Sequence, residues 1–299
     1  MTGYGYSNVE QFSYPVLSQR IIESLYWPQT FRQFFEQIHL PNDQLYEVPF
    51  EDGDTTFLVN RIGEGAEAPL EIIQYHGQVV KPYKIGEGFP ITYEETQFSK
   101  IPSVDHKPRK LGTKLGATID FDCMTVINAN IPAAHIITAT GQTTGFDGNT
   151  YTLAYYVGHH DWVDAIEVIQ TNGQVEPTDA VMNAQAYAML KKLPQFGVQF
   201  ASGEPSYASG RRPAYWEGLR IHVSERVPAN TIFVISTGTT ARSGQYSPMG
   251  NYVYNYDIRT RSQSNAGKDQ EEIYAYSAYV PAVLKGDHLA KITWTSPYP

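Results

Sequence analysis

The chain has 299 residues, of which 41% are apolar and only 18% charged, and its formal net charge is −9. This length allows a large buried core, and the composition excludes a disordered tail or a coiled coil. The acidic balance argues against binding that neutralises nucleic-acid phosphates, because such binding needs a basic face. A single cysteine, Cys123, excludes an intrachain disulfide framework and a cysteine-based zinc site. The 22 tyrosines favour extensive contact with neighbouring molecules, since tyrosine is enriched at interfaces.

The first residues have neither the basic nor the apolar stretch of a signal peptide. No apolar run approaches the roughly 18 residues that a membrane-spanning helix needs. We therefore expect an intracellular product without membrane contact. No internal repeat or flexible linker separates the chain into independent units.

Residues 13–40 carry two helical patterns between proline breaks. Their apolar residues recur at helical spacing in two groups: Leu17, Ile21, Ile22 and Leu25, then Phe31, Phe34, Phe35 and Ile38. A terminal segment this short cannot bury so many aromatic side chains alone, so it must pack on a body, its own or a neighbour's. We expect an apolar patch on the isolated subunit that contacts a neighbour through Trp27, Phe31, Phe34 and Phe35.

Residues 46–83 read as a long β-hairpin with a broad, glycine-bearing tip. Between residues 45 and 80 there are seven carboxylates, Arg61 is the only base, and the net charge is −6. Glu64 and Glu67 lie in the tip. An acidic hairpin with few large apolar groups makes a poor independent domain and is expected to lie on another surface.

One long helix is expected over about 108–130. Its apolar stripe recurs every fourth residue from Leu111 to Ile127. Gly112 and Gly116 are unfavourable inside a helix, so another element should pack closely there. Residues 100–114 have a net charge of +4. Three of these bases are candidates for contact with an acidic partner: Lys107, Arg109 and Lys110.

The rest of the chain mixes strands and helices without a regular βαβ alternation, so the expected class is α+β. Helices are expected over 160–170 and 184–193. Strands are expected over 179–183, 219–224, 231–235, 251–258, 271–283 and 290–294.

In this order, the segments from about residue 45 to the C-terminus resemble the major capsid proteins of tailed viruses with the HK97 fold. The matching stretches are the hairpin, the long helix, Asp179–Asn183 with the helix after it, Trp216–Pro228, and Ala278–Leu284, which is similar to that family's final strand. The resemblance implies an N-terminal arm (1–45), an extended hairpin loop (46–83), a peripheral domain with a spine helix (84–134 and 252–299) and an axial domain (135–251).

Two groups of residues are candidates for an enzymatic site, and the spacing within each argues against one. His159 and His160 are adjacent on a helix start and point about 100° apart, so they rarely ligate one ion together. Asp161 or Asp164 suits the first turn of that helix, where a carboxylate interacts favourably with the helix dipole. Asp120 and Asp122 lie two apart on the long helix, hence on different faces, and solvation or pairing with another subunit is the better interpretation.

The resemblance implies a shell subunit whose acidic hairpin lies over a neighbour's spine region, where opposite charge fixes register. Two ordinary solvated patches are the alternative. Some family members cross-link a hairpin lysine to a distant asparagine; residues 46–80 contain no lysine, so we expect non-covalent shells. A chain lacking residues 1–40 is expected to fold but not to form correct shells.

We therefore expect a major capsid protein, not an enzyme, that self-assembles as hexamers and pentamers into an icosahedral virion shell around double-stranded DNA. No cofactor or metal is expected. Scaffold, portal and decoration proteins are possible partners, DNA contact is non-specific, and assembly takes place in the host cytoplasm. Two alternatives stay open: an encapsulin-type nanocompartment, and a soluble metal-dependent hydrolase using His159, His160 and His222.

Overall fold

The structure, a computed structural model, describes ten stretches of the chain. These are residues 14–25, 29–41, 46–51, 75–92, 103–144, 150–152, 157–191, 215–237, 248–265 and 267–295. Among them, no helix is both long and apolar enough to cross a membrane.

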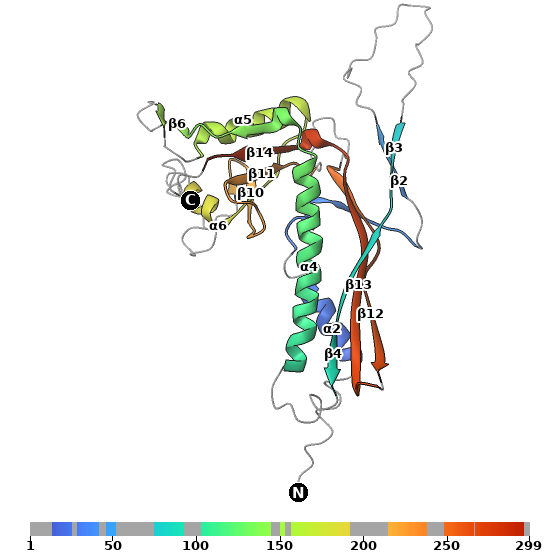
Figure 1. The fold of residues 1–299 in the computed structure, drawn as a ribbon. Helices are drawn as coiled ribbons and strands as arrows, with labels where there is room; N and C mark the ends of the chain where they lie inside the picture. Colours follow the sequence, from blue (N-terminus) through green and yellow to red (C-terminus); the bar gives the residue numbers. More distant parts are fainter. Residues whose placement is uncertain are drawn as a thin grey trace, which may run out of the picture.

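The longest helix, α4 (Ser103–Ala129), lies against a four-stranded sheet in the order β1-β12-β13-β4 (Figure 1). The strands are β1 (Glu36–His39), β12 (Gly250–Asn265), β13 (Gln270–Val283) and β4 (Tyr83–Thr92). Helix α4 begins five residues before the expected start, so Pro108 lies inside it. Helix α2 (Tyr14–Leu25) also packs on α4, and the 3-10 turn η1 (Arg32–Phe34) is the next described element.

A six-stranded sheet in the order β5-β14-β11-β8-β10-β9 forms the second half of the fold. Its strands are β5 (Ile136–Thr138), β14 (Leu289–Thr293), β11 (Thr231–Ile235), β8 (Asp179–Met182), β10 (Leu219–Val223) and β9 (Tyr215–Trp216). Helices α5 (His159–Asn172) and α6 (Ala184–Leu190) lie beside this sheet (Figure 1). Short 3-10 turns precede β5 (η2, Ala133–His135) and β14 (η3, Gly286–His288).

Strand β11 joins the two hydrophobic cores, because successive residues of a strand point to opposite faces. Phe233 and Ile235 belong to the core around α4, whereas Ile232 and Val234 belong to the core under α5 and α6. The two halves therefore share a strand. This agrees with the prediction from the sequence that no linker separates the chain into independent units.

Two small hairpins complete the fold. Strands β2 (Tyr46–Glu51) and β3 (Tyr75–Val80) pair antiparallel with each other and lead away from the four-stranded sheet (Figure 1). Strands β6 (Gln142–Thr144) and β7 (Thr150–Thr152) form the other pair.

The expected α+β class is confirmed, with three local corrections. The second helical pattern of the N-terminal segment is not a helix: after η1 the chain becomes β1, which pairs in parallel with β12. Residues 289–293, which the expected division counts with the peripheral domain, form β14 of the six-stranded sheet. Ala278–Leu284 lies largely in β13, so β14, not this segment, is the last described strand.

Candidate intersubunit surfaces

The described part of the N-terminal segment is built into its own subunit. On α2, Leu17, Ile21 and Leu25 are buried in the core around α4. A Cβ atom added at Gly112 would lie 2.0 Å from the Ser24 hydroxyl oxygen and 2.3 Å from the Ile21 carbonyl oxygen. The predicted close packing at Gly112 is thus confirmed, and α2 is the element that packs there.

The phenylalanines of this segment are also core residues. Phe31, Phe34 and Phe35 are 0%, 4% and 4% exposed, and Phe31 meets Phe233 edge to face at 6.0 Å between ring centroids. The expectation of an exposed apolar patch is therefore wrong for these three rings, because they are buried in the core of their own subunit. Trp27 lies outside the described residues. Contact of these rings with a neighbour stays a prediction.

Asp120 ties three parts of the subunit together. Its carboxylate is fully buried and accepts hydrogen bonds from the backbone N–H groups of Thr30 (2.6 Å) and Phe31 (2.5 Å) and from Arg226 Nη1 (2.9 Å). Burial raises the pKa of Asp120, while these donors act in the opposite direction. The expected solvation or intersubunit pairing of Asp120 is wrong, since its partners lie within the same chain.

Asp122 fixes the start of β4 on the long helix. Its Oδ2 accepts from the hydroxyls of Tyr83 (2.8 Å) and Tyr279 (2.5 Å). Burial, followed by the hydrogen bond to this carboxylate, raises the pKa of both phenols. The foot of the acidic hairpin is thus anchored to α4. The hairpin candidates Arg61, Glu64 and Glu67 lie outside the described residues.

The basic start of α4 is partly used within the subunit. Lys107 Nζ donates to the Pro90 carbonyl oxygen (3.1 Å), and Lys114 forms an ion pair with Glu87 (2.6 Å). Arg109 and Lys110 are exposed. Two of the three predicted contact bases therefore face solvent in the single subunit.

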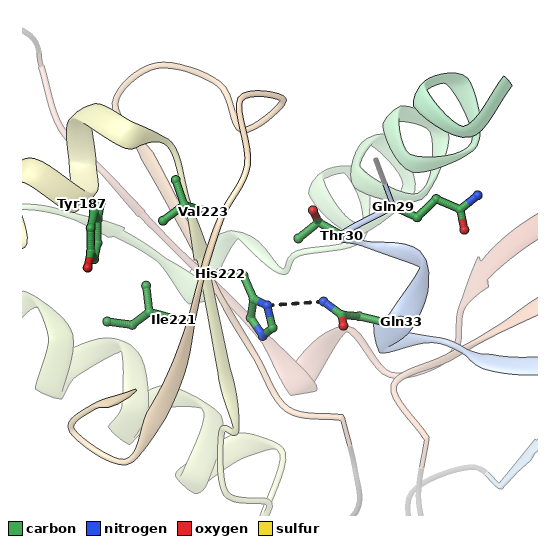
Figure 2. A pocket seen from close by; sticks show the side chains of 7 residues that line it. All are labelled: Gln29, Thr30, Gln33, Tyr187, Ile221, His222 and Val223. Carbon is green, nitrogen blue, oxygen red and sulfur yellow. Dashed lines mark hydrogen bonds between the residues drawn. The ribbon is translucent and has the colours of Figure 1, made fainter. Parts of the chain in front are cut away.

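The histidines of the hydrolase alternative do not form one site. His159 Nε2 lies 3.3 Å from Glu217, whereas His222 Nε2 lies 2.8 Å from Asp179 Oδ1. His222 lines a cavity of about 300 Å³, and its Nδ1 lies 3.4 Å from the Gln33 amide nitrogen. Figure 2 shows the two side chains pointing toward each other. Both ring nitrogens thus face protein groups. In the part of the chain that the structure describes, no group of three or more potential metal-ligating side chains occurs.

Of the two acids that the sequence offered for the first turn of α5, Asp161 is the one that lies there. Its Oδ2 accepts from the Gly158 N–H (2.6 Å), and its Oδ1 accepts from the Thr140 N–H (2.8 Å). A Cβ at Gly158 would come within 1.8 Å of the Gln142 carbonyl oxygen. This corner is therefore a structural cap rather than a metal site.

Residues 77–292 match the family model described as phage capsid protein. The chain belongs to this family. The match runs from β3 to β14, so it includes α4 and the strands of the six-stranded sheet. No curated protein sequence matches the chain.

Solved capsid structures share the fold of this phage capsid protein. The capsid of cyanophage P-SCSP1u is similar with a TM-score of 0.64 at 14% identity, covering 90% of this chain and 88% of that one. The mature capsid of bacteriophage PhiM1 is similar with a TM-score of 0.62 at 12% identity, covering 91% and 89%. The SrpI encapsulin of Synechococcus elongatus PCC 7942 has a TM-score of 0.54 at 13% identity, covering 87% and 85%.

These findings confirm the resemblance at the level of family and fold. The phage capsid family is structural, not enzymatic, and its members assemble into shells that form part of the virion.

Proposed function

We propose that this chain is the major capsid protein of a tailed phage. Many copies, arranged as hexamers and pentamers, form an icosahedral shell that encloses double-stranded DNA. The match of residues 77–292 to the phage capsid family carries this proposal. The net charge of −9 supports it, because an acidic wall does not hold packaged DNA by phosphate neutralisation.

The four-part division expected from the resemblance remains our proposal, with two changes. Residues 14–41 are counted with the peripheral part, because they pack on α4 and pair with β12. Residues 289–293 are counted with the axial part, because β14 pairs with β11 and β5. The hairpin of residues 46–83 is the element proposed to reach a neighbouring subunit.

The partners follow from this role. Other copies of the chain make the principal contacts, and the exposed bases Arg109 and Lys110 remain candidates for them. Scaffold, portal and decoration proteins join the shell in the host cytoplasm, and contact with DNA is non-specific.

An encapsulin-type nanocompartment is the second candidate, supported by the fold similarity to the SrpI encapsulin. The two differ in content, since a phage shell encloses a genome and an encapsulin does not.

The test is electron microscopy of the purified chain, followed by nucleic-acid analysis of particles from phage-producing cells. Closed icosahedral shells with nuclease-protected, genome-length DNA are expected. Small discrete particles would contradict both shell functions, and closed shells without DNA in producing cells would favour the nanocompartment.

A further inference from the structure

The hairpin β2–β3 is joined to the four-stranded sheet by a connector of two residues. Strand β3 ends at Val80 and β4 begins at Tyr83, so only Lys81 and Pro82 lie between them. Within the described residues, β2 and β3 pair only with each other, and they lead away from the sheet (Figure 1). The direction of the hairpin therefore depends on how this connector is held at its β4 end.

Tyr83, the first residue after the connector, is held by two other elements. Its backbone pairs with Tyr279 of β13, and this pair is the last one of the ladder between β13 and β4. Its hydroxyl donates to Asp122 Oδ2 of α4 at 2.8 Å, and the Tyr279 hydroxyl donates to the same oxygen at 2.5 Å. The centroids of the two rings lie 5.1 Å apart. One carboxylate oxygen of α4 thus joins β4 to β13 directly beside the connector.

The two tyrosines differ in how easily they can leave Asp122. Tyr279 is 0% exposed and its ring stacks on Tyr252 at 5.4 Å between centroids, so it cannot move without opening the core. Tyr83 is 42% exposed, and its hydrogen bond to Asp122 is open to solvent. Water can therefore replace Asp122 as the partner of the Tyr83 hydroxyl. Asp122 Oδ2 would keep the bond from Tyr279, so release leaves no acceptor without a donor.

The next residues of β4 limit what the release of Tyr83 can move. Lys84 is exposed, and its Nζ lies 3.8 Å from the centroid of the Tyr276 ring. Ile85 packs against the core around α4. Release of Tyr83 therefore frees residues 83 and 84 together with the connector, whereas the rest of β4 stays in the sheet.

We propose that the hydrogen bond between Tyr83 and Asp122 is a releasable latch that sets the direction of the hairpin relative to α4. With the latch closed, the connector starts from a residue fixed on α4, and the hairpin leaves the sheet in one direction. With the latch open, residues 81–84 can turn and the hairpin turns with them. The latch lies within one subunit, so the inference does not depend on the proposed shell function.

Pulsed electron paramagnetic resonance on the unassembled, full-length subunit tests the latch. One spin label is attached at Val79→Cys of β3, one pair from the hairpin foot, and the other at Thr125→Cys of α4; both positions are exposed. Cys123 is buried and stays unlabelled in the folded chain. We expect a single narrow distance distribution. Adding Tyr83→Phe should widen it by about twofold, because the freed connector opens locally while the rest of the subunit stays folded.

Two further variants make the test specific. Asp122→Ala removes the acceptor and should widen the distribution as Tyr83→Phe does, and the double variant should be no wider than either, because both remove the same bond. Tyr274→Phe is the matched control. It removes a hydroxyl that donates to Glu272 at the other end of β13, and it should leave the distribution narrow. Thermal melting confirms that each variant is folded.

A narrow, unchanged distribution in folded Tyr83→Phe would overturn the proposal, because the connector alone would then set the direction. A broad distribution in the chain that keeps Tyr83 and Asp122 would also overturn it, since the latch would not hold the hairpin. Equal widening by Tyr274→Phe would assign the effect to a general loosening of the sheet and would likewise contradict the latch.

Discussion

Residues 14–41 and the pair β2–β3 are consecutive in the sequence, and both are expected to reach a neighbouring subunit, yet the subunit uses them differently. The first places six large apolar side chains in the core around α4: Leu17, Ile21, Leu25, Phe31, Phe34 and Phe35. The second forms a sheet of two strands that pair with each other. A two-stranded hairpin is marginally stable alone in water.

The difference in apolar content and charge between these two segments indicates which kind of segment is suited to contacts between subunits. A segment with many apolar side chains gains free energy by packing into a hydrophobic core. Residues 14–41 pack into the core around α4 of their own subunit. A segment with high charge and little apolar surface gains little from folding onto its own body. It stays available for a surface of opposite charge.

Removing residues 1–40 should produce the largest effect, and it should abolish folding rather than assembly alone. Six buried side chains at about 1.5–3 kcal/mol each are comparable with a typical total stability of about 5–15 kcal/mol. The measurement is soluble yield and cooperative melting. Deletion of residues 1–13, which precede α2, is the control; a cooperatively folded chain lacking residues 1–40 would show that the segment is dispensable.

Gly112→Ala should destabilise the subunit although alanine is the better helix former. The helix preference favours alanine by about 1 kcal/mol, but the added methyl overlaps Ser24 and the Ile21 carbonyl of α2. We expect a net loss of about 1–3 kcal/mol, the usual cost of overpacking. Urea unfolding measures it, with the exposed Thr113→Ala as the matched helix control. Stabilisation by Gly112→Ala would mean that α2 does not lie on α4 as described.

The sequence predicts α4 and most strands because their periodicities are local and strong. It misses β1, where Phe31, Phe34, Phe35 and Ile38 have helical spacing but parallel pairing with β12 decides the conformation. The role of Asp120 is missed because its three donors come from residues 30, 31 and 226, and no local pattern joins them.

Acid should weaken the subunit through His288, which lies in the turn before β14. Burial, reinforced by Lys285, lowers the pKa of His288 from 6.5 to about 4, and its Nδ1 has no hydrogen-bond partner among the described groups. The His288 imidazole binds a proton more readily in the unfolded chain than in the folded one. The free energy of unfolding is therefore unaffected by this group above pH 6.5 and decreases as the pH falls towards 4. The loss should reach about 3 kcal/mol.

Urea midpoints of unassembled subunits between pH 7 and pH 4 measure this effect. His288→Leu should remove most of this slope, because the variant has no imidazole to protonate. An unchanged slope in the variant would assign the acid sensitivity to other groups.

The smallest effect is expected at the Lys114–Glu87 pair. Its side chains are 53% and 47% exposed, so solvent and salt screen the attraction. Glu87→Gln should change the free energy of unfolding by no more than about 1 kcal/mol. A larger loss, measured beside the conservative Lys114→Arg, would mean that this pair positions β4 on α4.

Hydrogen exchange on unassembled subunits and on shells compares the two regions most directly. The account predicts that amides of residues 14–25 and 29–41 are already protected in the unassembled subunit and change little on assembly. Amides of β2 and β3 should exchange quickly in the subunit and become protected only in shells. The reverse result, with residues 14–41 protected only after assembly and the hairpin strands equally protected in both states, would contradict the account.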